Sequence, residues 1–440
     1  MRALLLICAL STALAVDRAE ICAICHTNLA AGNGPYALWA NSMMSRASRD
    51  PYWRAKVASE IAQTPAAAGA IEAKCVNCHA PLQQGPKHIS DIDAFGDNGV
   101  NCIACHRLTA DGEPSPEPVA YGPHERPFAM PMRMHTGYEP AYGPHVMESA
   151  FCATCHTVIT PILTARGEVA GEFVEQAPFL EWQASEWPEN GISCQSCHVP
   201  QIEDLEYIAH RPPGGPFPPT RPRAPFGRHV FTGANAQMLA ILKLPAGRDR
   251  TLEFLESAAD LVLSGSLEER ALTLSVEIGN VTGHKLPTGY PGRRMWLHVV
   301  VEDRSGRRVF ESGAAPPPPQ PHHRVIERPD QVMLYEARLA DSAGRPTGSL
   351  MRAAAFEHDN RILPRGFNPS HSTRPASIRP VGVTGDPDFQ PGSDRVRYVL
   401  RAGSAPYHVE VRLLYDALGR DFRHTQQPVS IAAAELTVGP

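Results

Sequence analysis

The chain has 440 residues, of which 43% are hydrophobic and 7% aromatic, and its formal net charge is −5. This length is enough for about two or three domains, and the acidic balance gives no indication of a nucleic-acid partner. The 43 prolines and 34 glycines favour loop-rich packing over long regular elements.

The N-terminus has the pattern of a secretory signal peptide, which we place at residues 1–15. Arg2 supplies a positive start, residues 3–13 form an apolar run, and residues 13–15 make a small-x-small cleavage site. The apolar run is too short to span a bilayer, and charged residues follow it at positions 17–20, which disfavours an uncleaved membrane anchor. We therefore expect export to the periplasm or the cell exterior.

A five-residue motif, Cys-x-x-Cys-His, occurs five times and uses ten of the 11 cysteines. The copies, numbered motifs 1 to 5 in chain order, span residues 22–26, 75–79, 102–106, 152–156 and 194–198. In such a motif the two thiols form thioether bonds to haem, and the adjacent His ligates the iron from the proximal side. A redox cysteine pair or a zinc ribbon would not require a His after the second Cys in every copy. We therefore predict five covalently bound haem c groups, with Cys8 left over in the signal peptide.

Each motif residue then has a predicted role. The residues that attach haem are Cys22, Cys25, Cys75, Cys78, Cys102, Cys105, Cys152, Cys155, Cys194 and Cys197. The proximal iron ligands are His26, His79, His106, His156 and His198. Because attachment is the same in all five copies, any difference between the haems depends on the opposite face of each iron.

Between the motifs the sequence predicts short helices and long loops. A helix is expected over residues 35–46, another begins at Asp50-Pro51, and a third leads into motif 2. Residues 111–145 and the proline-rich connector at 211–228 have little periodicity, so we expect loops packed on haem. Residues 251–264 are predicted to form a helix that leaves the haem region.

From about residue 270 the apolar period changes to two. Leu272, Leu274, Val276 and Ile278 alternate with polar residues, and similar alternation recurs at 297–301, 396–400, 409–415 and 431–438. Short alternating strands with turn signals between them predict an antiparallel, Ig-like β-sandwich.

The expected fold is therefore α+β and multidomain. A signal peptide at 1–15 precedes a loop-rich, α-helical pentahaem domain at 16–240. A linking helix at 241–268 then leads to the β-sandwich at 269–440.

Each iron has a second axial position, which accepts His, Met or an exchangeable ligand. A His-rich loop lies between motifs 3 and 4, two His flank the proline-rich connector, and one His lies in a tight loop at 282–289. Motif 1 has no other His nearby, and a Met follows it instead. The candidates for distal ligation are Met44, His124, His135, His145, His210, His229 and His284. The alternative for each is an ordinary core or surface side chain.

The motifs and their surroundings resemble multihaem cytochromes of the cytochrome c-554 type and, more distantly, hydroxylamine oxidoreductase. The similar stretches are residues 39–47, 75–81, 99–108, 149–161 and 175–200. In the first stretch the family has a distal His where this chain has Met44, which implies a His/Met or an open haem 1. Residues 282–313 and 335–367 resemble the sandwich appended to many exported bacterial multihaem proteins.

The expected function is that of an exported electron carrier, in which five haems relay electrons between a redox donor and an acceptor protein. One alternative is an oxidoreductase of small nitrogen or sulfur species at a haem with an open site. All five motifs end in His, so the lysine-ligated variant of related ammonia-forming nitrite reductases is absent. A second alternative is a subunit of a surface-docked or polymeric electron conduit. No catalytic residue is assigned, and a membrane-associated redox complex and an oligomer stay open as assemblies.

Overall fold

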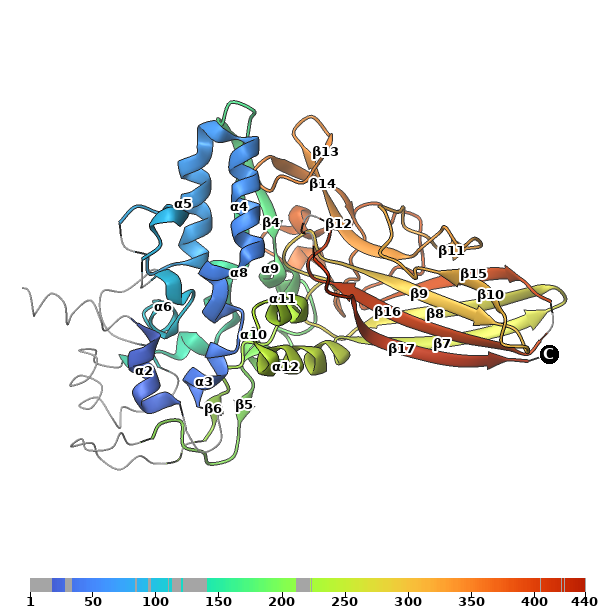
Figure 1. Ribbon diagram of the computed structural model, residues 1–440, viewed down its shortest axis with the longest axis horizontal. Coiled ribbons are helices and arrows are strands. Elements are labelled where there is room, and N and C mark those ends of the chain that lie inside the picture. Colours follow the sequence, from blue (N-terminus) through green and yellow to red (C-terminus); the bar gives the residue numbers. More distant parts are fainter. Residues whose placement is uncertain are drawn as a thin grey trace, which may run out of the picture. The chain divides into compact units, whose positions relative to one another are not determined.

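The computed structural model describes residues 18–27, 34–83, 85–93, 96–109, 111–112, 120–121, 141–210, 222, 224–403, 405–420, 422 and 424–439. The expected signal peptide, with Cys8, lies outside these residues. Helices and mostly antiparallel sheets are both present, as labelled in Figure 1, which confirms the expected α+β class. Among the residues that the structure describes, no helix has the length and apolar character needed to cross a bilayer.

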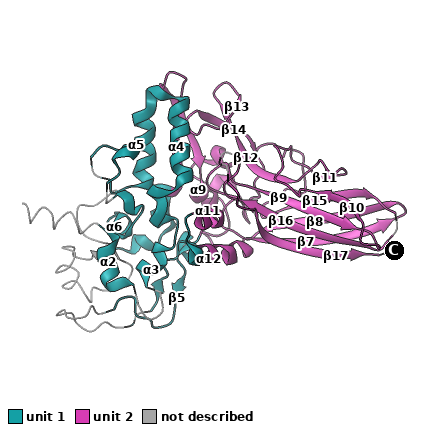
Figure 2. Cartoon of the chain, in the orientation of Figure 1, with its two compact units in different colours: residues 1–155, 193–232, 242–247 teal, residues 156–192, 233–241, 248–440 magenta. Residues whose placement is uncertain are grey.

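The chain divides into two compact units, coloured separately in Figure 2. Unit 1 comprises residues 1–155, 193–232 and 242–247, and unit 2 comprises residues 156–192, 233–241 and 248–440. The units interleave along the sequence, whereas we expected three consecutive parts after the signal peptide. The segment between motifs 4 and 5 therefore belongs to the same unit as the large sheets.

Unit 1 consists of short helices joined by long connections. Its longest helices, α4 (Pro51–Gln63) and α5 (Ala68–His79), pack side by side in Figure 1. Asp50 caps α4, because its carboxylate accepts a hydrogen bond of 2.9 Å from the Tyr52 amide, and Pro51 occupies the first helical position. This confirms the helix start expected at Asp50-Pro51. Trp53 and Ile71 are buried on these two helices.

The single helix expected over residues 35–46 is instead divided into α3 (Pro35–Ala40) and the 3-10 helix η1 (Met44–Arg49). The side chain of Asn41 donates to the carbonyl of Ala37, and the Ser42 hydroxyl donates to the carbonyl of Trp39. Such local hydrogen bonds compete with the helical ladder and explain the break.

The other elements of unit 1 are brief. The helices are α2 (Ala19–His26), α6 (Cys102–His106), α8 (Ser149–His156) and α10 (Cys194–His198), with His156 already in unit 2. The 3-10 helices are η2 (Pro65–Ala67), η3 (Ile89–Asp91), η4 (Gly96–Asn98) and η5 (Pro144–Met147). The strands are β1 (Ala120–Tyr121), β2 (Ala141–Tyr142), β5 (Gln201–Ile202) and β6 (Phe226–Gly227).

Unit 2 is built on two sheets that share one core. One sheet follows the order β13-β12-β9-β16-β17, with β10 and β14 on β9 and β12, and the other follows β11-β15-β8-β7. Its strands are β7 (Ala259–Glu268), β8 (Ala271–Asn280), β9 (Arg294–Glu302), β10 (Arg308–Ser312), β11 (Val325–Ile326), β12 (Leu334–Asp341), β13 (Pro346–Thr347), β14 (Ala353–Asp359), β15 (Ser393–Arg401), β16 (Tyr407–Asp416) and β17 (Val429–Val438). Leu274 and Val276 of one sheet and Val299 and Val411 of the other belong to the same buried cluster. The alternating period-two pattern is therefore confirmed as the source of this core.

A second part of unit 2 comes from the segment between motifs 4 and 5. It contains the hairpin β3 (Val158–Leu163) and β4 (Val169–Gln176), followed by α9 (Pro178–Gln183). The remaining helices are α11 (Ala236–Ile241), α12 (Pro245–Glu256, which begins in unit 1), η6 (Pro369–His371) and η7 (Pro375–Ile378). Leu180 of α9 shares a buried cluster with Leu363 and Phe389, so the segment is part of the packing of unit 2.

The linking helix expected over 251–264 is wrong in its second half. The helix α12 ends at Glu256, and residues 259–268 form strand β7, which pairs with β8 from Ala259↔Asn280 to Glu268↔Ala271. Glu269 adopts a positive φ of 48° in the tight connection between these two strands. Leu261, Leu263 and Leu267 pack against the shared core at period two, and this packing overrides the helical interpretation.

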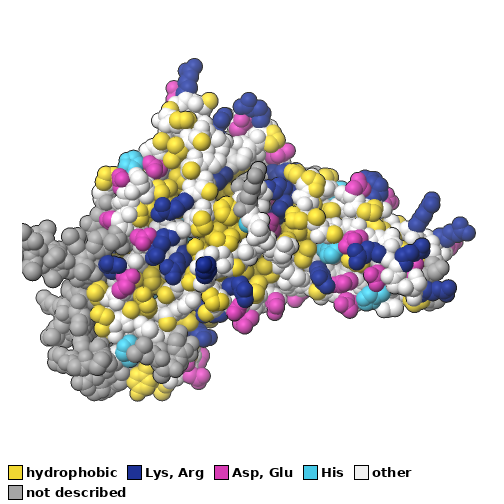
Figure 3. Space-filling model, viewed as in Figure 1, with side chains coloured by type: hydrophobic (Ala, Val, Ile, Leu, Met, Phe, Trp, Pro, Cys, Tyr) yellow, Lys and Arg dark blue, Asp and Glu magenta, His cyan; other side chains and the backbone are white. Residues whose placement is uncertain are grey.

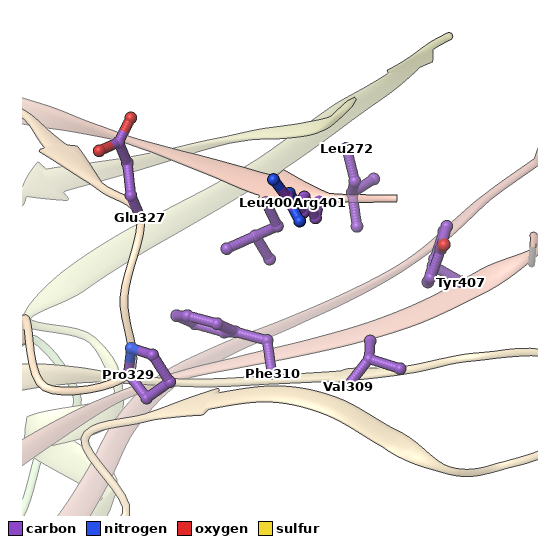
Figure 4. A pocket seen from close by; sticks show the side chains of 8 residues that line it. All are labelled: Leu272, Val309, Phe310, Glu327, Pro329, Leu400, Arg401 and Tyr407. Atoms are coloured by element: carbon purple, nitrogen blue, oxygen red, sulfur yellow. The ribbon is translucent and has the colours of Figure 1, made fainter. Parts of the chain in front are cut away.

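The surface of unit 2 has a mixed charge pattern. In the view of Figure 3, basic and acidic side chains are interspersed over the large sheets. At one place on the sheets a pocket of about 220 Å³ opens, and Figure 4 shows the side chains around it. Its lining residues are Leu272, Val309, Phe310, Glu327, Pro329, Leu400, Arg401 and Tyr407. None of them is a Cys or a His, so the pocket offers no ligand of the kind that the haem motifs require.

We predict that the shared core of the two sheets carries much of the stability of unit 2. Leu274 is 0% exposed in β8, so Leu274→Ala is expected to lower the free energy of unfolding by about 2–5 kcal/mol. Urea unfolding followed by circular dichroism measures this difference. The matched control is Val262→Ala on the adjacent strand, where the side chain is 61% exposed and little change is expected. Equal effects of the two variants would contradict the assignment of the core.

Candidate functional site

All five motifs have the same local structure, because each forms the last turn of a helix that ends at the motif histidine. The helices are α2, α5, α6, α8 and α10, which end at His26, His79, His106, His156 and His198. Within a motif the two cysteines are three residues apart and the His follows directly, at positions i, i+3 and i+4. These positions lie on one face of a helix, so both thiols and the imidazole point the same way.

Two of these helices are only five residues long and depend on caps at their N-termini. The side chain of Asn101, which is 1% exposed, accepts hydrogen bonds of 3.0 and 3.2 Å from the amides of Ile103 and Ala104. Ser193 forms a reciprocal capping box with Ser196. Helices this short are marginal without such contacts, so the caps position motifs 3 and 5.

The ten motif cysteines form no disulfides, and thiols from different motifs meet. Hydrogen bonds join Cys22 to Cys102, Cys78 to Cys155, and Cys152 to Cys194. The bond with Cys152 lowers the pKa of the Cys194 thiol to about 7, whereas burial raises the pKa of Cys105 to about 11. The Cys105 thiol also acts electrostatically on Cys152 and Cys155. Motif 4 is therefore a neighbour of motifs 2, 3 and 5, and motif 3 is a neighbour of motif 1.

Three of the motif histidines direct Nδ1 at a backbone carbonyl from a distant part of the chain. The distances are 2.9 Å from His26 to Ile208, 3.2 Å from His79 to Ala47, and 2.6 Å from His198 to Thr232. An Nδ1–H that donates to a carbonyl fixes the tautomer in which Nε2 carries the lone pair, as metal-ligating histidines require. Burial lowers the pKa of His198, which also favours the neutral ligand form. Sequence analysis did not identify these carbonyl partners, and no local pattern indicates them.

His79 has a further contact that holds its ring. The indole of Trp53 stacks on the imidazole with ring centres 4.6 Å apart and an interplanar angle of 9°. The Trp53 Nε1 atom is buried and has no hydrogen-bond partner. Trp53, a residue of α4, therefore holds the ring of the motif 2 histidine in place.

Of the described candidate distal ligands, His229 has a ring contact with a motif histidine. Its Nδ1 lies 2.8 Å from the carbonyl oxygen of Gly227, and its ring is nearly parallel to that of His106, with an interplanar angle of 14° and ring centres 6.2 Å apart. Burial, together with the neighbouring His106 and His26, lowers the pKa of His229 to about 4. His229 is therefore a neutral imidazole at physiological pH.

The rings of His106 and His229 are nearly parallel, with their centres 6.2 Å apart, so His229 lies beside the histidine of motif 3. The sequence indicated His229 as one candidate, but its pairing with motif 3 is visible only in the fold.

The remaining described candidates lie in different surroundings. His145 directs Nε2 at the carbonyl of Leu108, 2.9 Å away and two residues beyond motif 3. The amide of His210 donates to the carbonyl of Cys25 over 2.7 Å, so this residue lies against motif 1. The carbonyl oxygen of Met44 accepts a hydrogen bond of 2.9 Å from the amide of Val100, which lies two residues before motif 3.

His284 lies in unit 2, in the loop that follows β8. Its Nδ1 is 3.0 Å from the carbonyl oxygen of Lys285 and 3.2 Å from Oγ1 of Thr282. The carbonyl contact again fixes the tautomer with the lone pair on Nε2. The other two candidates, His124 and His135, lie outside the described residues.

Buried polar atoms in unit 1 provide a test of whether these residues fit haem. Nε1 of Trp53, Nδ1 of His210 and Nε of Arg228 are buried without a hydrogen-bond partner. Buried polar atoms of this kind are normally satisfied, and the carboxylates of haem would accept hydrogen bonds from the two N–H donors, whereas an imidazole nitrogen that carries a lone pair would bind iron instead. Together with ten cysteines outside any disulfide and the tautomers of the proximal histidines, they fit covalently attached haem.

A separate titratable cluster in unit 2 involves His322, Asp386 and Asp394, whose ligand atoms lie within 4.8 Å of one another. His322 is 2.9 Å from Asp386 through Nε2, and its Nδ1 faces the Asn360 amide nitrogen at 3.2 Å. The Asn360 amide also donates to the Leu334 carbonyl at 2.7 Å, which fixes its orientation. His322 must therefore accept at Nδ1 and donate from Nε2, so this nitrogen has no lone pair for a cation. The cluster is therefore a polar network within unit 2.

Two comparisons with known proteins support this interpretation. Residues 21–107, which include motifs 1 to 3, match the family model described as cytochrome c554 and c-prime. The fold is similar to that of a penta-heme cytochrome c552 from Thermochromatium tepidum, with a TM-score of 0.60 and 18% sequence identity over 96% of this chain and 99% of that chain. No curated protein matches the chain. The chain thus carries a cytochrome c554-type segment, within a fold like that of a solved multihaem cytochrome.

Proposed function

We propose that this protein is an exported electron-transfer protein with five covalently attached haem c groups. The observation that carries the proposal is that five identical attachment sites are joined by contacts between their own thiols. Contacts between motifs 1 and 3, 3 and 4, 4 and 2, and 4 and 5 leave none of the five isolated. Bound haem supplies one-electron chemistry, and adjacent attachment sites are what a relay through several haems requires.

The roles of this chain's own residues follow from the geometry. The ten cysteines hold the cofactors and the five motif histidines supply proximal nitrogen ligands. Backbone carbonyls of Ile208, Ala47 and Thr232 orient three of these rings. Burial lowers the pKa of His198, which favours the neutral ligand form of that ring. Each of these features holds a haem or orients a ligand of its iron, so we favour electron transfer over catalysis.

We further propose His229 as the distal ligand at motif 3, and the nearly parallel rings of His106 and His229 support this assignment. Met44 stays our candidate for haem 1, and His145, His210 and His284 stay candidates without an assigned iron.

Location and partners are inferred from the sequence pattern. The N-terminal segment supports export to the periplasm or the cell exterior, where haem is attached to motifs of this type. The partners we propose are a redox donor protein and an acceptor protein. We also propose that the two sheets of unit 2 form an Ig-like sandwich, for which their shared core is the support.

Intact-protein mass spectrometry tests the haem count. The purified holoprotein is expected to weigh five haems more than the polypeptide that begins near residue 16. The double variant Cys102→Ala/Cys105→Ala should lose one haem, because only motif 3 is removed. A wild-type mass with fewer than five haems would contradict the proposal, and a mass that retains residues 1–15 would contradict cleavage of the signal peptide.

Replacement of His229 tests the assignment at motif 3. His229→Ala is expected to convert one haem of five from low-spin to high-spin in the ferric spectrum, and that haem should then bind cyanide. The control is His298→Ala, since this side chain pairs with Glu311 on the sheets at 3.0 Å. An unchanged low-spin spectrum in folded His229→Ala protein would rule the assignment out. Cyanide binding by the wild type would instead favour an open-site oxidoreductase.

A further inference from the structure

The imidazole of His79 in motif 2 is contacted on its face and at its edge by one short stretch of unit 1, residues 47–54. The indole of Trp53 lies nearly parallel to the ring, with ring centres 4.6 Å apart and an interplanar angle of 9°. The carbonyl oxygen of Ala47 lies 3.2 Å from Nδ1 at the edge of the same ring. The face contact restricts tilting of the imidazole, and the edge contact restricts its rotation within the plane.

The stretch 47–54 is itself held by hydrogen bonds. Nε of Arg54 donates to the carbonyl of Ser48 at 2.8 Å, which ties the first turn of α4 to η1. The hydroxyl of Ser48, a residue that is 0% exposed, donates to the carbonyl of Asp97 in η4 at 3.1 Å. The two groups that contact the imidazole are therefore fixed relative to each other.

Trp53 also has a buried donor that the packing of unit 1 does not use. Its side chain is 7% exposed, and its Nε1 atom has no hydrogen-bond partner among the described residues. Trp39 of α3 is equally buried, but its indole donates to the carbonyl of Val100 at 2.8 Å. A buried indole N–H normally finds an acceptor, and the carboxylates of haem are acceptors of this kind. Trp53 thus has the properties of a residue placed beside a haem, rather than of core filling alone.

An indole stacked on an iron-bound imidazole acts unequally on the two oxidation states of the iron. The face of the indole carries negative potential and attracts positive charge. An imidazole bound to ferric iron carries more positive charge than one bound to ferrous iron. The stacked indole therefore stabilises the ferric state more than the ferrous state, which lowers the midpoint potential of that haem.

We propose that Trp53 is a positioning residue for His79 that lowers the midpoint potential of the haem bound at motif 2. The proposal rests on the proposed function, in which His79 is the proximal ligand of that haem. The step affected is the one-electron reduction of ferric to ferrous iron by the redox donor protein, in which no bond to the protein breaks and no proton moves. Motif 2 thereby gains a distinguishing contact on the proximal side, whereas the sequence predicted such differences on the opposite face of each iron.

Spectroelectrochemical titration of the full haem-loaded protein tests this role. Trp53→Leu should raise the midpoint potential of one haem of five and change its g-values in the ferric electron paramagnetic resonance spectrum. The expected change is about threefold to tenfold in the ferric-to-ferrous ratio at a fixed potential, or about 30–60 mV for a one-electron couple. Trp53→Phe retains an aromatic face, so its shift should be smaller.

Two further proteins serve as controls. Val57→Ala is the matched one, because Val57 lies one turn further along α4 and is 1% exposed. This variant should lower stability without moving any midpoint potential. The double variant Cys75→Ala/Cys78→Ala, which should carry four haems, identifies the haem that responds. In that protein, Trp53→Leu should no longer move any midpoint potential.

The outcomes separate the role of Trp53 from the proposed function. If Trp53→Leu carries five haems with the midpoint potentials and g-values of the wild type, the role of Trp53 is overturned and the electron-transfer function stands. An equal shift in Val57→Ala, or a shift that persists without haem at motif 2, also overturns it. A wild-type peptide containing residues 75–79 without haem would instead contradict the five-haem function. If Trp53→Leu does not fold, Trp53→Met decides by the same titration, because it fills the site without an aromatic face.

Discussion

The haem-binding half depends on one constraint, which is that every motif helix ends at its histidine. The spacing of i, i+3 and i+4 brings two thiols and an imidazole to one helical face. The end of the helix lets the chain turn away after the histidine, so that other segments can approach the ring. The carbonyls that orient His26, His79 and His198 come from residues 182, 32 and 34 positions away. Haem attachment is therefore a local property of the sequence, whereas ligand orientation is a tertiary one.

Motif 4 connects the parts of this arrangement. Its cysteines contact those of motifs 2 and 5, and the Cys105 thiol of motif 3 interacts electrostatically with both cysteines of motif 4. The same helix, α8, is where the chain passes from unit 1 to unit 2. The chain therefore passes covalently into unit 2 at the motif with the most neighbours.

The sequence was sufficient for features that depend on short-range periodicity. The five motifs, the cap at Asp50 and the alternating strand β8 all appear where they were expected. The sequence was insufficient where contacts between distant segments determine the local structure. The strand β7 was interpreted as helix, because only its pairing with β8 shows that Leu261 and Leu263 face a sheet core. Nor does any local pattern pair His229 with His106, since 123 residues separate them and their proximity depends on burial after folding.

The position of the segment between motifs 4 and 5 changes how the large sheets should be viewed. A boundary near residue 269 would separate Val174, Leu180 and Ala184 from Leu363, Ile378 and Phe389, although all six share one buried cluster. It would also separate Glu181 from Lys285 and Arg361, leaving charges buried without partners. Both changes would destabilise the segment that joins motifs 4 and 5. The sheets are therefore better understood as the support of that segment than as a removable appendage.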